Sequence, residues 1–369
     1  MTKIFQIVSS INLGGAENLT FNLIDQCSLL HPGKFEFIMV ELYATKSFYA
    51  YRKKVELRSK GIRVITLGGT SKRTSLPIAP FNLLYHIQKE KPQVIHSHTD
   101  LPDFVLSLAL KIRSLKRVKI VRTIHNTELW SDHQDVGRVV ESSFKEDKII
   151  GVSHAALNAY FKIREAYRLP ISSKSMVIYN GCPTPKKESH HFKLDPQRIN
   201  IAFCGRFVRQ KGVDILVDVI QKLDKKIKDR ILFHFVGDGP YKELVANLAA
   251  QNDNVLMYGA VGNLAGKIYD FDFLIVPSRF EGLGLISIES SLSGVPVIAA
   301  RAPGLDETLP PDWPLFFDLD NTVELENIFQ KIIDAAFDKE HLQKVAHDYV
   351  SKKFSMKEMA IGYSSIYLE

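Results

Sequence analysis

Short apolar segments rich in β-branched residues alternate along the chain with longer segments of 3.6-residue hydrophobic periodicity. This alternation predicts successive βα units, in which parallel strands are covered by helices on both faces. The pattern breaks once and restarts near residue 199. The expected strands are residues 3–8, 35–40, 62–67, 93–97, 118–123, 148–152 and 176–179, then 199–204, 231–236, 255–258, 271–276 and 296–299. We therefore predict an α/β fold of two doubly wound, Rossmann-like domains that face a central cleft.

The break in the pattern runs from Cys182 to Asn200, a segment with three prolines and no apolar period. Such a segment is typical of an interdomain linker. The last stretch, Ser355 to Leu368, has the pattern of an amphipathic helix that we expect to cross back onto the N-terminal domain. The predicted parts are an N-terminal domain of residues 1–182, a linker of 183–199, a C-terminal domain of 200–352 and a returning helix of 353–369.

Length and composition agree with this division, because 369 residues with 45% apolar content suffice for two cores. Three widely spaced cysteines suggest reduced thiols in a cytoplasm. The N-terminus lacks the order of a secretion signal, and no apolar run approaches the ~20 residues that cross a bilayer. We expect a cytoplasmic protein, peripheral at most on the inner face of the cell membrane.

Charge is divided unevenly between the halves. Residues 1–182 carry 26 Lys and Arg against 15 Asp and Glu, whereas residues 183–369 carry 22 against 26. The formal net charge of +7 is therefore the sum of +11 and −4. A basic N-terminal half suggests an anionic partner there, although an ordinary solvated basic surface explains the excess equally well.

The most specific local pattern runs from Val276 to Leu285, where Glu281, Gly282, Leu283 and Gly284 follow a strand and lead into a helix. Backbone amides at a helix start, with glycine allowing close approach, suit a diphosphate. Glu289 lies eight residues after Glu281, about two helical turns, so the two carboxylates are expected roughly 10 Å apart on one side. Carboxylates accept hydrogen bonds from vicinal hydroxyls. The alternative makes Glu281 a helix-dipole charge and Glu289 a surface residue.

A second pattern, Cys204 to Gly212, also follows a strand and opens a helix. Its Arg206 and Lys211 can converge on one anion and take the place of a metal ion. Cations aimed at a leaving phosphate would stabilise the transition state more than the ground state. Two ordinary surface cations are the alternative.

Weaker signals also follow predicted strands. Gly237 lies in a post-strand turn before a helix and is assigned to donor binding, with a plain tight turn as the alternative. Gly15 follows the first strand, where it can let a backbone amide approach the diphosphate or the acceptor. Its loop does not match GxGxxG, which disfavours a dinucleotide cofactor. His125 ends a strand where it can hydrogen-bond a sugar. His96 and His98 either line the same cleft or satisfy neighbouring backbone groups.

Taken together, these motifs resemble glycosyltransferase family 4, whose members have the GT-B fold. The carrying residues are Gly14 to Glu17, His125, Tyr179 to Gly181, Gly205 with Arg206, Lys211 with Gly212, Gly237 to Gly239, and Glu281 with Glu289. The resemblance implies transfer of a sugar with retention of configuration, with no metal and no cofactor. The donor would be a nucleoside-diphosphate sugar, with UDP-sugar favoured over GDP-sugar.

In that picture Arg206 and Lys211 hold the diphosphate with the amides near Leu283 and Gly284. Glu281 binds the sugar and Glu289 the ribose, while His125 contacts the sugar from the opposite wall. The leaving phosphate helps to deprotonate the acceptor. The resemblance places the protein in bacterial cell-surface polysaccharide synthesis, such as lipopolysaccharide, O-antigen or capsule, with a glycan or lipid-linked acceptor.

The acceptor side is predicted from basic segments of the N-terminal half. Residues 46–60 form a basic amphipathic helix with Phe48, Tyr51 and Val55 at helical spacing, and residues 111–122 form a second basic run. An anionic membrane surface or a lipid-linked acceptor fits such a face. Its assigned residues are Arg52, Lys53, Lys54, Lys116 and Arg117. A core-facing helix with a solvated basic side is the alternative.

Two other functions are weighed against transfer. A nucleotide-sugar epimerase of the same fold would use no acceptor, and a non-catalytic sugar-binding protein would not need Glu281, Glu289, Arg206 and Lys211 together. Nucleic acid is not an expected partner, because no aromatic-rich recognition motif accompanies the basic half.

Overall fold

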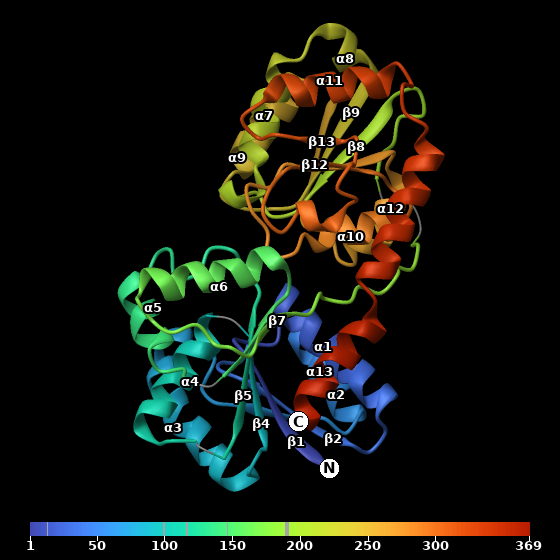
Figure 1. The fold of residues 1–369 in the computed structure, drawn as a ribbon. Helices are drawn as coiled ribbons and strands as arrows, with labels where there is room; N and C mark the ends of the chain where they lie inside the picture. The colour runs from blue at the N-terminus through green and yellow to red at the C-terminus, as the bar shows by residue number, and fades with distance from the viewer. Residues whose placement is uncertain (13, 99, 116, 146, 189–191) are drawn as a thin grey trace. The chain divides into compact units, whose positions relative to one another are not determined.

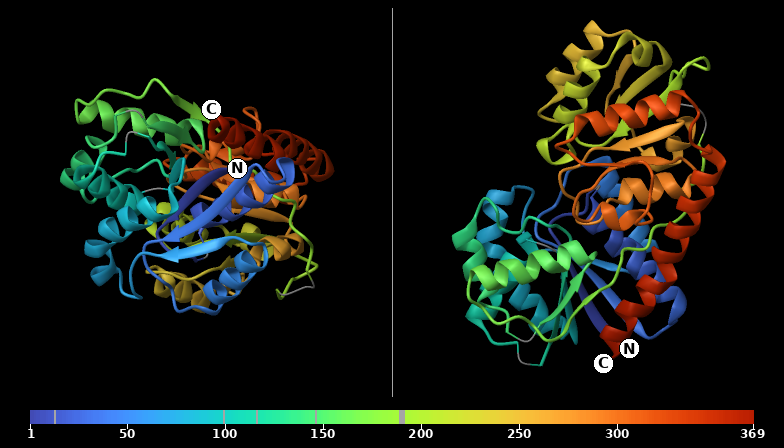
Figure 2. Two further views of the ribbon diagram at one scale, coloured as in Figure 1. Left: turned by 90° about the horizontal axis from the view of Figure 1, so that it is seen from below. Right: turned by 45° about the horizontal axis from the view of Figure 1, so that its top comes forward.

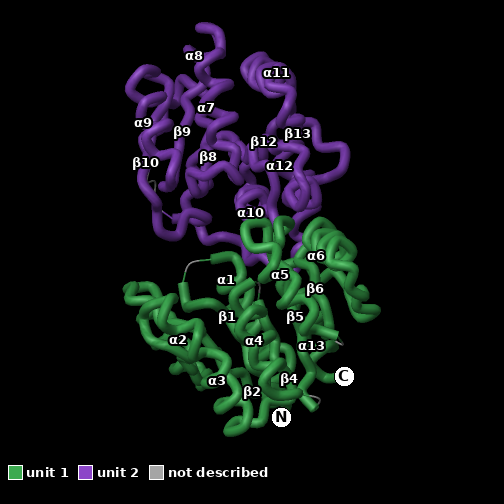
Figure 3. The backbone as a smooth tube through the Cα atoms, turned by 90° about the vertical axis from the view of Figure 1, so that its left-hand side faces the viewer, with its two compact units in different colours: residues 1–181, 356–369 green, residues 182–355 purple. Residues whose placement is uncertain are grey.

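The structure is a computed structural model that describes residues 1–369 except 13, 99, 116, 146 and 189–191. The chain divides into two compact units (Figure 3). The N-terminal unit comprises Met1–Gly181 and Met356–Glu369, and the C-terminal unit comprises Cys182–Ser355. Each unit is built around one parallel β-sheet with helices on its faces.

The N-terminal unit has a seven-stranded sheet in the order β3-β2-β1-β4-β5-β6-β7, with every neighbouring pair parallel. Its strands are β1 (Thr2–Val8), β2 (Phe35–Glu41), β3 (Arg63–Thr66), β4 (Val94–His98), β5 (Lys119–Ile124), β6 (Lys148–Gly151) and β7 (Ser175–Val177). The order reverses direction beside β1, which is the switch point where ligands of open α/β sheets bind, beyond the carboxyl ends of the strands.

Seven helices belong to this unit in the described part of the chain. They are α1 (Gly15–Leu30), α2 (Phe48–Ser59), α3 (Lys72–Glu90), α4 (Asp100–Ile112), α5 (Gln134–Glu141), α6 (His154–Ala166) and α13 (Met356–Leu368). Apolar residues of α3, α4 and α5 share one core with Phe5 and Ile7 of β1. Gln6, between them, points to the opposite face, where its amide contacts Tyr367 of α13.

Helix α13 is the predicted returning helix, and the structure confirms that it joins the N-terminal unit (Figures 1 and 2). It lies beside α1, where the Cys27 thiol contacts the Ser364 hydroxyl at 3.3 Å. Met359, Tyr363, Ile366 and Tyr367 are all buried. The amphipathic pattern of the last segment is therefore satisfied by packing against the first domain, although it is last in the sequence.

The C-terminal unit has a six-stranded parallel sheet in the order β10-β9-β8-β11-β12-β13. Its strands are β8 (Ile199–Cys204), β9 (Ile231–Val236), β10 (Val255–Tyr258), β11 (Phe273–Val276), β12 (Val297–Ala300) and β13 (Phe316–Phe317). Strand β8 lies at the centre, with Ile201 opposite Phe233 on one side and Phe273 on the other. Burial on both faces explains why β8, β9 and β11 are mostly apolar, with Asn200 and His234 as the polar exceptions.

Six α-helices and three 3₁₀ turns surround this sheet in the described residues. The helices are α7 (Val213–Lys222), α8 (Lys225–Arg230), α9 (Lys242–Gln251), α10 (Leu285–Leu292), α11 (Thr322–Ile333) and α12 (Lys339–Lys353); the 3₁₀ turns are η1 (Arg209–Lys211), η2 (Leu264–Asp270) and η3 (Asp306–Thr308). The segment predicted as a linker contributes Phe192 to the apolar core of this unit. The two doubly wound sheets are confirmed, whereas the two-residue strand β13 was not predicted.

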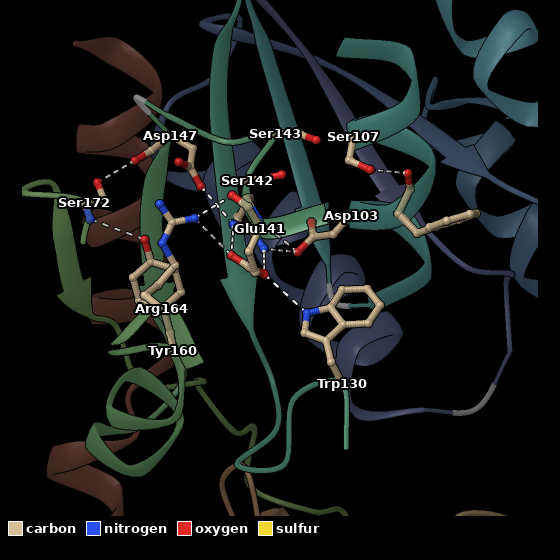
Figure 4. A network of polar contacts seen from close by, with 12 residues as sticks. Asp103, Ser107, Trp130, Glu141, Ser142, Ser143, Asp147, Tyr160, Arg164 and Ser172 are labelled. Carbon is tan, nitrogen blue, oxygen red and sulfur yellow. Dashed lines mark hydrogen bonds and ion pairs between the residues drawn. The ribbon is translucent and has the colours of Figure 1, made fainter. Parts of the chain in front are cut away.

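A buried ion cluster ties three helices of the N-terminal unit to its sheet (Figure 4). Arg122 of β5 is 1% exposed and donates to Asp103 of α4, to Glu141 of α5 and to Asp147 before β6. Arg164 of α6 donates to the backbone carbonyl of Glu141. Burial raises the pKa of Asp103 to about 6, against the opposing effect of the Arg122 guanidinium. Arg122 was expected in a basic surface run, and this expectation was wrong because three carboxylates draw it inward.

The cluster predicts a large cost for removing its central cation. Arg122→Met leaves buried carboxylates uncompensated and should lower the free energy of unfolding of this unit by about 3–5 kcal/mol. The chain has two tryptophans, Trp130 here and Trp313 in the other unit, so Trp130 fluorescence in a Trp313→Phe background reports urea unfolding of this unit. Arg117→Met, at an exposed position of the same run, is the matched control. A loss below about 1 kcal/mol for Arg122→Met would contradict the account.

Candidate functional site

Two loops at the carboxyl edge of the C-terminal sheet pack directly against each other. Gly212 ends the loop after β8 with φ of 65°, and a Cβ there would lie 1.7 Å from the carbonyl oxygen of Pro277. Only glycine allows this approach. The Arg279 amide donates to the Gln210 carbonyl at 2.8 Å, and the Gln210 side chain donates to the Phe280 carbonyl at 3.2 Å. The loops after β8 and β11 therefore form one surface.

Arg279 clamps the two loops by its side chain. Its guanidinium makes two parallel bonds to the Asp214 carboxylate, both 2.8 Å, and a third to the Arg209 carbonyl at 2.7 Å. Bidentate geometry of this kind fixes orientation as well as distance. Neither residue was predicted from the sequence. Arg279 lies three residues after β11, and Asp214 lies in the first turn of α7, which precedes β11 in the sequence. Both placements are too common to single out.

Lys211 and Glu281 meet where these loops touch. The Lys211 ammonium donates to both carboxylate oxygens of Glu281, at 2.6 and 2.8 Å, and the Ser278 hydroxyl donates to Glu281 Oε1 at 2.7 Å. Glu281 is 6% exposed. Burying a carboxylate is costly unless it is paired and hydrogen-bonded, and Lys211 and Ser278 provide these partners.

Arg206 lies on the same loop as Lys211 but is exposed to solvent. Its guanidinium donates to the Gln210 side chain at 3.3 Å, and Gln210 is the residue that bonds the second loop. The structure thus places Arg206 on the joined surface, while the cation that contacts Glu281 is Lys211.

Helix α10 begins at Leu285, shortly after Glu281 in the sequence, as predicted. The Glu281 amide donates to the Pro303 carbonyl at 2.9 Å, and the Gly284 amide donates to the Gly304 carbonyl at 3.3 Å. Gly304 has φ of 76°, and a Cβ there would lie 2.1 Å from the Glu281 carbonyl oxygen. Gly282 and Leu283 are buried in this turn. The Gly284 amide has a protein acceptor, and so does the Ser287 amide, which donates to the Gly284 carbonyl at 2.9 Å. The candidate anion donors at this helix start are therefore the amides of Leu285 and Ile286.

Glu289 lies in the second turn of α10 and is largely buried. Burial raises its pKa to about 7. The carboxylate is close enough to Cys204 and Cys182 to raise the pKa of both thiols, after burial itself. At neutral pH the group therefore changes between a carboxylate that only accepts hydrogen bonds and an acid that also donates one.

Gly237 follows β9 and brings a third loop to this edge. A Cβ on Gly237 would lie 1.9 Å from the Gly205 carbonyl oxygen, so the turn after β9 packs on the loop that carries Arg206. The Phe207 amide donates to the Asp238 carbonyl at 2.8 Å. Gly237 thus packs against the loop that carries Arg206.

In the N-terminal unit, Gly15 is the first residue of α1 and follows the loop after β1. A fully buried glutamate fixes this loop, since Glu41 accepts from the Ile11 amide at 3.2 Å and from the Thr66 hydroxyl at 2.6 Å. Lys54 is ion-paired with the same carboxylate. The basic residue predicted to face an acceptor or membrane therefore neutralises a buried acid.

The other predicted surface cations differ in their surroundings. Lys53 pairs with Glu56 at 2.8 Å and lies over the Phe21 ring, whereas exposed Arg52 lies 5.8 Å from the Phe48 ring centroid. Arg117 is exposed. Lys116 lies outside the described residues.

His125 follows β5 and is partly buried. Burial lowers its pKa to about 3, so the ring is neutral. Its Nε2 lies 3.2 Å from Nδ1 of His98. His96 and His98 are at most 1% exposed and bond side chains of the unit's interior, so neither lines an open surface.

The described residues contain no helix long and apolar enough to cross a membrane. They also contain no cluster of three or more His, Cys, Asp or Glu side chains that could hold a metal ion.

Comparison with known proteins accounts for both units. A family model described as "Glycosyltransferase Family 4" matches residues 14–185, and one described as "Glycosyl transferases group 1" matches residues 198–333. The chain belongs to glycosyltransferase family 4. Members of this family retain the configuration of the transferred sugar, and the chain is accordingly a retaining glycosyltransferase that uses nucleotide sugars. This finding does not support the alternatives of an epimerase or a non-catalytic protein.

Two curated proteins and one solved structure are similar to this glycosyltransferase over most of its length. It is 29% identical over 293 residues to the O-antigen biosynthesis glycosyltransferase WclY of Escherichia coli, covering 74% of this chain and 78% of that one. It is 24% identical over 370 residues to the capsular polysaccharide biosynthesis glycosyltransferase CapH of Staphylococcus aureus, covering 97% and 92%. Anabaena HepE, solved in complex with UDP-glucose, covers 99% of each chain with a TM-score of 0.77 at 17% identity. The structural likeness confirms the GT-B fold.

The raised pKa of Glu289 makes the stability of the glycosyltransferase depend on pH. An acid whose folded-state pKa is raised stabilises the fold fully below its unfolded pKa of about 4.3, and this contribution is lost as the pH rises toward about 7. Glu289→Gln should therefore gain stability relative to the parent between pH 4.5 and 7, by about 1–3 kcal/mol. Thermal unfolding of both proteins across this range measures the difference, with Glu243→Gln, at an exposed position, as the control. A difference that is constant with pH would contradict the assignment.

Proposed function

We propose that the C-terminal unit binds the diphosphate of a nucleotide-sugar at the start of α10, and that the sugar passes without a metal ion to a glycan or lipid-linked acceptor bound by the N-terminal unit. The observation that carries the proposal is the Lys211–Glu281 pair beside that helix start. It supplies a cation for phosphate and a carboxylate for sugar hydroxyls at one place.

Lys211 has the donor capacity for both tasks. An ammonium group carries three N–H donors, and two point at the Glu281 oxygens. The third remains for a phosphate oxygen. Arg206 on the same loop adds a planar guanidinium, and the first-turn amides of α10 add the positive end of a helix. We assign the diphosphate to these three groups.

Glu281 has acceptor capacity left for a sugar. Its Oε1 accepts from Ser278 and Lys211, whereas Oε2 accepts from Lys211 and keeps a lone pair. A hydroxyl of the donor sugar can donate there. Glu289, in the second turn of α10, is assigned to the ribose hydroxyls, which both donate to and accept from a carboxyl group.

In the proposed step the acceptor oxygen forms a bond to the anomeric carbon while the bond from that carbon to the phosphate oxygen breaks. The acceptor proton passes to the leaving phosphate on the same face, which yields the glycosylated acceptor and a nucleoside diphosphate. Lys211, Arg206 and the helix start stabilise the charge that develops on the phosphate. His125, which is neutral, is assigned to a hydroxyl of the transferred sugar.

A UDP-sugar is the proposed donor, supported by the HepE complex with UDP-glucose. A bacterial surface polysaccharide is the proposed product, supported by relatives named for O-antigen and capsule synthesis.

Removing either partner of the central pair should abolish most turnover. Glu281→Ala and Lys211→Ala should each lower kcat/KM by at least ~100-fold, the size of losing one polar transition-state contact. The measurement is release of UDP from a panel of UDP-sugars in the presence of acceptor glycans. Lys222→Ala breaks an exposed Lys–Asp pair of the same unit and should change turnover little. Near-normal activity in both site variants would refute the site.

Helix α2 supports a membrane-facing acceptor surface. Phe48, Tyr51 and Val55 are 75%, 68% and 47% exposed, and their spacing places them on one side of α2 with Arg52. Apolar side chains beside a cation fit the surface of an anionic bilayer. We propose that this stripe holds the enzyme at the inner face of the membrane, where lipid-linked acceptors reside.

Flotation with phosphatidylglycerol vesicles tests the stripe. Phe48→Ser with Tyr51→Ser should weaken vesicle binding at least about tenfold, because two aromatic side chains leave the membrane, and Arg52→Gln about fivefold. The comparison variant changes Phe81 and Tyr85 instead. Both residues are exposed on α3, and neither was predicted to face a membrane. Undiminished binding by the α2 variant, or a loss confined to the α3 variant, would contradict the assignment.

A further inference from the structure

A chain of buried side-chain hydrogen bonds connects α13 to His125 within the N-terminal unit. Nδ1 of His98 lies 3.2 Å from Nε2 of His125, and Nε2 of His98 lies 2.8 Å from Oε1 of Gln6. The Gln6 amide nitrogen donates to the Tyr367 hydroxyl at 2.9 Å. These contacts join the carboxyl ends of β4 and β5 to the last turn of α13 by way of β1.

The chain continues beyond Tyr367. Nδ1 of His96 lies 2.6 Å from the Tyr367 hydroxyl, and Nε2 of His96 lies 2.7 Å from the Thr123 hydroxyl. The Tyr363 hydroxyl lies 3.0 Å from Thr123. Both tyrosines are at most 2% exposed, so water does not compete for these partners.

The directions of the bonds between Gln6 and His125 follow from Gln6, because an amide has one nitrogen that donates and one oxygen that accepts. Its oxygen accepts from Nε2–H of His98. A neutral imidazole carries one N–H, so Nδ1 of His98 is an acceptor and the proton between the two rings belongs to Nε2 of His125. On the other side, the Tyr367 oxygen accepts from Gln6, and its hydroxyl also contacts Nδ1 of His96.

We propose that His98 is a positioning residue that holds His125 in its Nε2–H tautomer, and that the Tyr367 hydroxyl of α13 sets this state through Gln6. Nδ1 of His125 is then a hydrogen-bond acceptor, suited to a hydroxyl that donates to it. That this hydroxyl belongs to the transferred sugar rests on the proposed function.

Burial agrees with the neutral rings that the assignment requires. It lowers the pKa of His96 and of His98 well below the ordinary value, and the other histidines add to the shift. The pKa of His125 falls for the same reason. At neutral pH each of the three rings therefore carries a single proton, on one of its two nitrogens.

The direct test is the tautomer itself, read without substrate from multiple-bond ¹H–¹⁵N correlations of protein labelled at its 12 histidines. Variants His125→Gln and His98→Gln assign the two rings by the signals they remove. The expected result is Nε2–H for both His98 and His125. Nδ1–H at His125 in the parent protein would overturn the proposal, whatever the variants do.

Two tyrosine variants separate this role from simple packing. Tyr367→Phe removes the acceptor of the Gln6 amide and should give a mixture of tautomers at His98 and His125. Tyr363→Phe removes an equally buried hydroxyl from the same helix, at the end of the hydrogen-bond series that lies farthest from His125. It should leave the tautomers of His98 and His125 unchanged. Equal effects of the two variants on His125 would overturn the proposal.

Kinetics with the donor then connect the tautomer to transfer. His98→Leu should lower kcat about tenfold, which is less than the cost of a wrong tautomer where the imidazole itself is the general base. His98→Asn places a side-chain oxygen near the Nδ1 position and should restore most of the lost kcat. No rescue by Asn would count against the positioning role. If the tautomers are as expected but His125→Ala turns over normally, the assignment of His125 to the sugar fails while the positioning role stands.

Discussion

The contact between Lys211 and Glu281 is the interaction on which the rest of the site depends. A carboxylate this deeply buried would be too costly without its cation, and the cation reaches it because Gly212 lets one loop touch the carbonyl of Pro277. The Arg279–Asp214 clamp keeps the loops in this register. Lys211 keeps one N–H donor and Glu281 keeps one acceptor lone pair, so one arrangement serves both the folded protein and a bound ligand.

The N-terminal unit uses buried polar groups differently. Its Arg122 cluster fixes helices against the sheet, while the chain from Tyr367 to His125 fixes the direction of hydrogen bonds. Both are built from residues whose burial makes an unpaired group expensive, so each member constrains its neighbours. This series of hydrogen bonds connects α13, which the last residues of the sequence form, to His125 at the carboxyl end of β5.

Sequence patterns predicted the fold well, because continuous apolar runs mark strands buried on both faces and amphipathic periods mark the helices. They predicted the loops that carry Glu281 and Lys211 for a similar reason, since each loop follows a strand. They failed where three-dimensional pairing decides: Arg122 and Lys54 read as surface cations, yet buried acids bind both. The clamp of Arg279 and the partners of His98 join separate segments, and no local pattern marks them.

A crystal structure of the enzyme with a bound UDP-sugar tests the central claim most directly, because it shows where the phosphates lie. The account predicts a phosphate oxygen within hydrogen-bonding distance of the Lys211 ammonium and the first-turn amides of α10, with a sugar hydroxyl on Glu281. Phosphates elsewhere in the protein, or held through a divalent cation, would contradict it.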